Sequence, residues 1–145
     1  MKLAKNIRNI AVRVLQNEAD AIHNLIGYLD ADFEACVQKI LTSKGRVVIT
    51  GVGKSALIAN KIVATLNSTG TPAIFMHAAD AIHGDLGMVQ DDDVVICISK
   101  SGNTPEIKVL VPLLKKLGSV LVALVSNTQS YLAEQADFVL NATIG

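Results

Sequence analysis

Tryptophan is absent from the sequence, and aromatic residues of any kind make up only 3% of its 145 residues. This scarcity removes the stacking platforms on which proteins bind single-stranded nucleic acid. An excess of charge of either sign is also missing, because 13 basic and 13 acidic side chains cancel. A broad basic surface for DNA, RNA or acidic lipid is therefore not expected, whereas a local site for one small anion is compatible with this balance.

Long apolar runs are missing as well. The two longest stretches without a charged residue, 62–79 and 117–133, are interrupted by glycine, asparagine and other polar residues. Neither offers the roughly 20 mostly apolar residues that a membrane span needs. Four basic side chains among the first 13 residues occupy what would be the apolar centre of a signal peptide. We therefore expect a cytoplasmic protein with no membrane partner.

Cysteine occurs only twice, at Cys36 and Cys97, without the close spacing of a metal or redox motif. In a reducing cytoplasm both are expected to stay reduced and to act as small buried residues. The length predicts one domain, because about 100–200 residues is the usual size of a single core. Half of the residues are hydrophobic, and with so few aromatics that core must consist of Val, Ile, Leu and Ala.

Apolar residues before position 42 recur at three- and four-residue spacing, which predicts a long amphipathic helix and, after Asp30, a second helix. From Arg46 onward the pattern changes to short apolar runs rich in β-branched residues, separated by helical patterns. The five runs are Val47–Ile49, Ala73–Met76, Val94–Ile98, Val120–Val125 and Phe138–Leu140. Such runs are typical of strands buried on both faces, and their alternation with helices predicts βαβ units. We expect an α/β fold, a three-layer α/β/α sandwich around a five-stranded parallel sheet, with a helical N-terminus.

Ligands bind at the carboxyl ends of the strands in such a sheet, so the loops after the runs carry the functional hypotheses. The first of these loops reads GVGKS over 51–55. A Walker A motif would require glycine where Val48 stands. Gly53 would still let the backbone approach an anion, and Ser55 and the N–H groups of a helix start would attract it. The alternative is an ordinary tight turn with a solvated Lys54.

The second loop follows the third run and spans 99–106. Thr104 is a good N-cap and Pro105 a good first helical residue. Polar groups ahead of this helix would lie at the positive end of its dipole and form a phosphate cradle. The residues that would supply them are Ser99, Ser101, Gly102 and Asn103. The plain alternative is a capped helix with a polar turn, in which Glu106 complements the helix dipole instead of acting as a general base.

The third loop follows the second run and holds His77, Asp80, His83 and Asp85. Histidine is the side chain best suited to proton transfer near neutral pH. The spacing of these four residues fits no standard metal motif. The remaining histidine, His23, lies within a helical pattern and is assigned no role.

Four segments together resemble the sugar isomerase (SIS) domain of arabinose-5-phosphate isomerases, over about residues 40 to 141. They are GVGKS at 51–55, STGTP at 68–72, HGDLGM at 83–88 and the S-x-S-G-x-x-x-E pattern at 99–106. The glycine turn and the serine loop are similar to SIS domains in general. The HGDLGM segment is the specific one, and it favours the arabinose-5-phosphate branch of the family.

This resemblance implies reversible interconversion of D-ribulose 5-phosphate and D-arabinose 5-phosphate through an enediol, a step toward the Kdo of lipopolysaccharide. It implies Glu106 as the base, Lys54 as the group that stabilises charge, and His83 as a ring-opening or sugar-hydroxyl contact. It also implies that no cofactor is required, that His77 can take up an inhibitory zinc ion, and that the protein is a homodimer or homotetramer. The implied phosphate- and sugar-binding residues are Gly53, Ser55, Gly70, Thr71, His77, Ser99, Ser101, Gly102, Asn103 and Thr104.

The family also has a glutamate just beyond the last strand and a histidine on a later helix, and both would fall past Gly145. Paired regulatory CBS domains, which many members carry, are absent. The sequence is therefore expected to be one SIS domain, 1–145, that stops one or two helices early. Two other functions stay open, namely a phosphosugar-binding module that senses its ligand without turnover and an isomerase of another sugar phosphate. A purely structural α/β domain would leave the ionisable loops unexplained.

Overall fold

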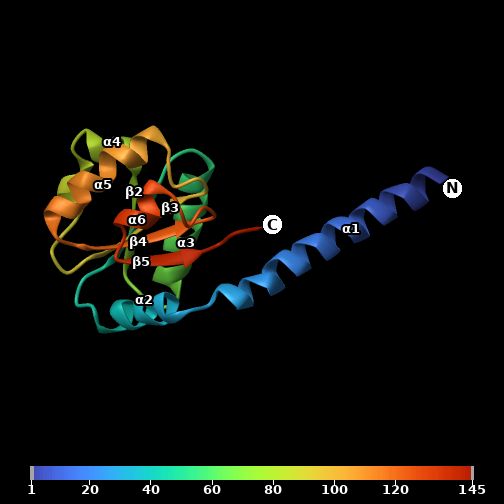
Figure 1. Ribbon diagram of the computed structural model, residues 1–145, viewed down its shortest axis with the longest axis horizontal. Helices are drawn as coiled ribbons and strands as arrows, with labels where there is room; N and C mark the ends of the chain where they lie inside the picture. The colour runs from blue at the N-terminus through green and yellow to red at the C-terminus, as the bar shows by residue number, and fades with distance from the viewer. Residues whose placement is uncertain (1, 145) are drawn as a thin grey trace.

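The computed structural model describes residues 2–144 (Figure 1). Its helices are α1 (Lys2–Asn24), α2 (Ala31–Thr42), α3 (Lys54–Ser68), α4 (Ala78–Ile82), α5 (Pro105–Leu117) and α6 (Tyr131–Gln135), with short 3-10 helices η1 (Leu25–Tyr28) and η2 (Asp85–Met88). Its strands are β1 (Val47–Gly51), β2 (Ala73–His77), β3 (Val94–Ser99), β4 (Val120–Val125) and β5 (Phe138–Asn141). Each predicted apolar run lies within one strand, and no strand extends more than two residues beyond its run.

The five strands form one parallel sheet in the order β2-β1-β3-β4-β5, which confirms the predicted fold class. β1 lies between two partners, because Val47 pairs with Ala73 on one side and with Val94 on the other. All strands run the same way, so the loops that follow them meet at one edge of the sheet. The residues predicted to be functional therefore gather there if they follow a strand.

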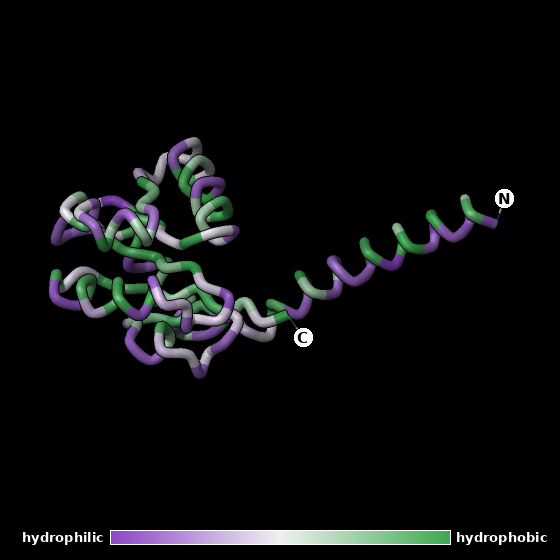
Figure 2. The backbone as a smooth tube through the Cα atoms, turned by 90° about the horizontal axis from the view of Figure 1, so that it is seen from above, coloured by the Kyte–Doolittle hydropathy of each residue, from purple (hydrophilic) through white to green (hydrophobic). Residues whose placement is uncertain are grey.

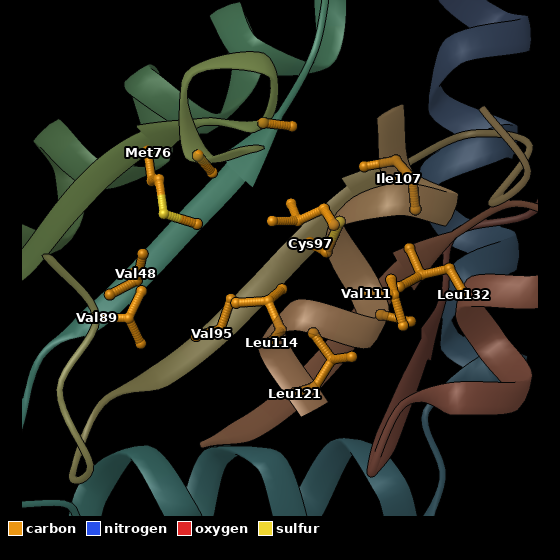
Figure 3. Packing of buried hydrophobic residues seen from close by; sticks show 14 of the residues in the cluster. Val48, Met76, Val89, Val95, Cys97, Ile107, Val111, Leu114, Leu121 and Leu132 are labelled. Carbon is orange, nitrogen blue, oxygen red and sulfur yellow. The ribbon is translucent and has the colours of Figure 1, made fainter. Parts of the chain in front are cut away.

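Helices cover both faces of the sheet, so the predicted three layers are confirmed (Figure 1). On one face the strands pack against α4, α5 and α6, in a cluster that includes Val95 and Leu114 (Figure 3). On the other face Ile49 packs with Ala59 of α3, while Cys36 of α2 packs against β3 and β4. Full burial of each large aliphatic side chain stabilises the fold by roughly 1.5–3 kcal/mol. Both cysteines are free and buried, as predicted.

An ion pair joins the amino ends of β1 and β3. Asp93, whose side chain is 1% exposed, lies 3.3 Å from the guanidinium of Arg46 and accepts hydrogen bonds from the backbone N–H groups of Arg46 and Gln90 at 2.8 Å each. The guanidinium also donates to the carbonyl of Met88 and so fixes the end of η2. Burial would raise the pKa of Asp93, but these hydrogen bonds and the arginine charge lower it, and the net shift of the pKa is downward.

The N-terminal helix α1 extends away from the sheet, and none of its residues is buried (Figure 1). Apolar and polar residues alternate along it in Figure 2, as the predicted amphipathic pattern requires. Its apolar stripe includes Leu3, Ile7, Leu15 and Ile22, each at least 60% exposed. Amphipathic helices normally bury such a stripe, yet within residues 2–144 nothing covers it. No helix in this range is both long and apolar enough to span a membrane.

Candidate functional site

A cleft of about 430 Å³ opens at the carboxyl edge of the sheet, where open parallel sheets bind ligands. Its volume falls within the roughly 300–1,000 Å³ that is usual for small-molecule sites. The β1–α3, β3–α5 and β4–α6 loops line it together. The polar lining residues are Ser55, Ser99, Lys100, Ser101, Thr104, Ser126 and Asn127. The first two predicted loops therefore do meet at one cleft.

β1 runs into α3 through a crowded glycine turn. Gly53 has φ +59°, in the region that favours glycine. A Cβ atom on Gly51 would lie 3.1 Å from the Cβ of Ser55 and 3.2 Å from the carbonyl oxygen of Ile98. Glycine thus lets α3 begin close to β3, with Lys54 as its first residue.

The two helices that begin at the cleft, α3 and α5, lack a side-chain cap. Asp30, His77 and Ser130, by contrast, each cap their helix with a hydrogen bond. Thr104 and Pro105 occupy the predicted N-cap and first positions of α5, but the Thr104 hydroxyl accepts no hydrogen bond from the helix. The uncapped N–H groups of a helix carry the positive end of its dipole. Two such ends therefore point to one cleft.

The hydroxyl groups of the β3–α5 loop differ in what they bond. Ser99 Oγ accepts a hydrogen bond from Gly102 N–H at 3.0 Å, and Ser101 Oγ accepts one from Asn103 N–H at 3.2 Å. These two bonds shape the loop. Thr104 Oγ1, in contrast, is buried without a hydrogen-bond partner anywhere in residues 2–144. Leaving a buried hydroxyl unpaired costs about 1–3 kcal/mol, and this one belongs to a residue of the cleft wall.

The three predicted catalytic side chains follow strands that end at this edge. Lys54 begins α3, Glu106 lies in the first turn of α5, and His83 follows α4 directly. Lys54 and His83 are exposed and Glu106 is half-buried. Neither Lys54 nor Glu106 forms an ion pair within the described chain. None of the three lines the cleft itself, and their catalytic roles stay a prediction.

His77 ends β2 and caps α4, because its Nδ1 accepts a hydrogen bond from the N–H of Ala79 at 3.2 Å. Its ring also meets the ring of Phe75 edge-on, with centroids 6.1 Å apart. With Nδ1 as acceptor, the neutral ring carries its proton on Nε2. Zinc at Nε2 would need the other tautomer and would break the cap. Residues 2–144 also contain no group of three side chains that could hold a metal ion.

Two predicted sugar-binding residues, Gly70 and Thr71, lie at the opposite edge of the sheet. They precede β2 and line a separate pocket of about 240 Å³, together with Arg46 and Pro72. In a parallel sheet a residue just before a strand is separated from the carboxyl edge by the full length of that strand. The structure therefore places Gly70 and Thr71 at the edge opposite the cleft of this chain, and their sugar-binding role stays a prediction.

Four residues near the site were not predicted from the sequence. Ser126 and Asn127, which follow β4, and Lys100 line the cleft. Thr50, in β1, is fully buried, and no group in the described part of the chain bonds its hydroxyl. A signal existed for the first two, because they are the first polar residues after an apolar run. For Thr50 the signal was its position directly after the aliphatic run Val47–Ile49, where it is the first residue with a hydroxyl.

An open parallel sheet with two uncapped helix starts over a hydroxyl-lined cleft places the chain among α/β proteins, a class whose ligand sites lie at the carboxyl edge of the sheet. The family model of the SIS domain matches residues 40–145. The chain belongs to the SIS domain family.

Relatives of known name support this assignment. The chain is 44% identical over 147 residues to the arabinose 5-phosphate isomerase KdsD of Pseudomonas aeruginosa, an alignment that covers 100% of this chain and 45% of the relative. It is 45% identical over 139 residues to a probable arabinose 5-phosphate isomerase of Haemophilus influenzae, covering 96% and 41%. The solved structure of Escherichia coli CFT073 c3406 in complex with arabinose 5-phosphate superposes with a TM-score of 0.91 at 39% identity, covering 97% of this chain and 75% of that one. The chain thus spans less than half the length of the two curated relatives.

Proposed function

We propose that this domain forms the phosphosugar site of an aldose–ketose isomerase that interconverts D-ribulose 5-phosphate and D-arabinose 5-phosphate. The observation that carries the proposal is the convergence of two uncapped helix starts on one cleft, whose wall includes Thr104, a residue with a buried hydroxyl that has no hydrogen-bond partner within residues 2–144. A phosphate group supplies the negative charge and the acceptors that these groups lack. The names of the relatives support the choice of sugar.

The phosphate would sit between the starts of α3 and α5. There it would accept hydrogen bonds from helix N–H groups and from the hydroxyls of Ser55 and Thr104, both of which line the cleft. Ser99 and Ser101 each accept one hydrogen bond within the loop, which leaves the proton of each hydroxyl available for donation. A chain of zero net charge can bind the anion in this way, because the attraction comes from local dipoles.

The proposed chemistry moves one proton between two neighbouring carbons. Glu106 takes a proton from C1 of the ketose, and the electron pair of that C–H bond forms the C1=C2 bond of the enediolate. Lys54 stabilises the negative charge that develops on the oxygen of C2. Return of the proton to C2, with transfer of the hydroxyl proton from the oxygen of C1 to that of C2, gives the aldose. His83 contacts a sugar hydroxyl or assists ring opening.

Because substrate and product are isomers, the reaction has no net oxidation and the proposal requires no cofactor. The one role proposed for zinc is that of an inhibitor bound at His77. The Ala79 N–H that bonds Nδ1 opposes zinc at the other ring nitrogen. Zinc inhibition would therefore be weak unless further ligands come from outside residues 2–144.

The protein is proposed to act as a homodimer or homotetramer. The exposed apolar stripe of α1 supports this proposal, because a helix without tertiary contacts is marginally stable in water. Light scattering on the protein at micromolar concentration tests it. A dimer or tetramer mass is expected, and a monomer mass would count against it.

The decisive experiment follows ribulose 5-phosphate by 13C NMR with this chain and with a version extended at its C-terminus. Arabinose 5-phosphate should accumulate with the extended version, and Glu106→Gln should lower its kcat by about 100-fold or more, the usual contribution of a positioned base. Binding without turnover would instead identify a sensing module. Turnover of a six-carbon phosphate in its place would identify an isomerase of another sugar.

A further inference from the structure

The β3–α5 loop, the proposed phosphate cradle, is hydrogen-bonded to the segment 126–132, which follows β4 and includes the start of α6. Three backbone N–H groups of that segment donate to oxygen atoms of the loop. Ser126 N–H bonds the Lys100 carbonyl at 3.0 Å, and Leu132 N–H bonds the Gly102 carbonyl at 3.1 Å. The third bond reaches a side chain, because Tyr131 N–H donates to Asn103 Oδ1 at 3.0 Å.

The two segments are also in direct steric contact. Gly102 has φ +69°, and a Cβ atom there would lie only 2.0 Å from Ser130 Oγ and 2.4 Å from Ser130 Cβ. Ser130 is 1% exposed and caps α6 by accepting a hydrogen bond from Ala133 N–H. The backbone of the cradle therefore rests on the capping residue of α6, and neither can move far without the other.

Within residues 2–144, Asn103 supplies the one side-chain hydrogen bond across this junction. Its Oδ1 is occupied by the first N–H group of α6, so Asn103 acts as a second cap of that helix from a neighbouring loop. An amide oxygen is an acceptor and cannot hydrogen-bond a phosphate oxygen that is itself an acceptor. The geometry thus directs this part of Asn103 toward α6.

We propose that Asn103 is a positioning residue, an inference that rests on the proposed phosphate site: by bonding Tyr131 N–H it holds the cradle backbone in the orientation that binds phosphate. Asn103 contributes to binding through α6, although it makes no bond to the anion with its oxygen. The helix α6 has five residues, and none of them lines the cleft. Its first N–H group nevertheless helps to hold the phosphate cradle in place through Asn103.

The test removes the bond from each end separately. Asn103→Ala removes the acceptor at an exposed position. Tyr131→Pro removes the donor, and proline suits this position because Tyr131 is the first residue of α6 and Ser130 before it has φ −77° and ψ 164°. Tyr131→Ala is the matched control, because it also loses the phenol ring but keeps the N–H.

Calorimetry with inorganic phosphate and with arabinose 5-phosphate measures the dissociation constant for each variant of this chain. Asn103→Ala should weaken binding about fivefold, the usual effect of one lost hydrogen bond. Tyr131→Pro should weaken it by a similar factor relative to Tyr131→Ala. Adding Asn103→Ala to Tyr131→Pro should change nothing further. In the version extended at the C-terminus, KM should rise in the same proportion while kcat stays within about twofold.

A direct phosphate contact by Asn103 would give a different pattern. Asn103→Ala would then weaken binding equally whether it is combined with Tyr131→Pro or with Tyr131→Ala, and the proposal would be overturned. Unchanged phosphate binding in Asn103→Ala would overturn the proposal as well. Circular dichroism tests whether each variant is folded. Phosphate binding without turnover, in this chain and in its C-terminally extended version, would refute only the isomerase function. No phosphate binding by the wild-type chain would refute both.

Discussion

Replacing Thr104 with valine should move stability and ligand binding in opposite directions. Within residues 2–144 the buried Thr104 hydroxyl has no hydrogen-bond partner and caps no helix, so valine removes no bond made by these residues. An unpaired buried hydroxyl costs about 1–3 kcal/mol, although local relaxation recovers part of this. We expect the free variant to be about 1 kcal/mol more stable, which for a chain of this size is a rise of roughly 3 °C in Tm.

The same substitution should weaken binding, because the ligand loses the hydrogen bond that satisfies this hydroxyl. A hydrogen bond to a charged acceptor contributes about 1.5–3 kcal/mol, so the dissociation constant for phosphate should rise roughly 10- to 100-fold. Calorimetric titration and thermal unfolding of the same samples measure both effects. Thr104→Ser keeps the hydroxyl and is the matched control.

Two results would refute the reasoning about Thr104. A loss of stability in the valine variant that the serine variant does not share would mean that the hydroxyl has a partner in the free protein. Phosphate binding as tight as in the wild type would mean that the hydroxyl does not face the ligand.

Three further predictions concern the scaffold. Asp93→Asn should cost at least about 2 kcal/mol by chemical denaturation, because Asp93 holds two backbone N–H groups and a guanidinium. Because the pKa of Asp93 is lowered, its contribution to the free energy of unfolding is present above about pH 4 and is lost as pH falls through the lowered value. If the wild type and the variant lost stability equally between pH 4 and lower pH, this would be contradicted. Gly102→Ala should destabilise the fold by more than about 2 kcal/mol, because backbone strain at positive φ adds to the collision with Ser130. Gly118→Ala, at φ +76° in open space, should cost only about 1 kcal/mol. Equal losses of stability in the two variants would argue against the collision. Burial raises the pKa of Cys97 to about 12, so its thiol should react with a disulfide reagent at about pH 8 only as fast as the protein unfolds, and faster labelling would contradict its burial.

The layers of the fold could be predicted because their signals are local. The run Val94–Ile98 is uniformly apolar and β-branched apart from one cysteine, which suits a strand covered on both faces, and the structure has β3 over 94–99. The position of Thr104 before Pro105 likewise predicted where α5 begins. Whether the Thr104 hydroxyl caps the helix could not be predicted, because that choice depends on the neighbouring loop.

The composition of the site could be predicted only in part. Gly70 and Thr71 were assigned by resemblance, although a residue just before a strand lies at the edge opposite the cleft. Asn103 was placed with the phosphate ligands because it belongs to the serine loop. Its bond to Tyr131, 28 residues further along the chain, is a contact that no local pattern encodes.

The bare helix α1 has a consequence for how assembly can be observed. With no buried residue, its backbone hydrogen bonds open without disturbing the core, so its amides should exchange with solvent far faster than those of β3 and β4. Protection of these amides would then come only from whatever covers the stripe of Leu3, Ile7 and Leu15. The rate of amide hydrogen exchange in α1 therefore reports whether the chain has associated, and it can be measured in the same sample in which turnover is followed.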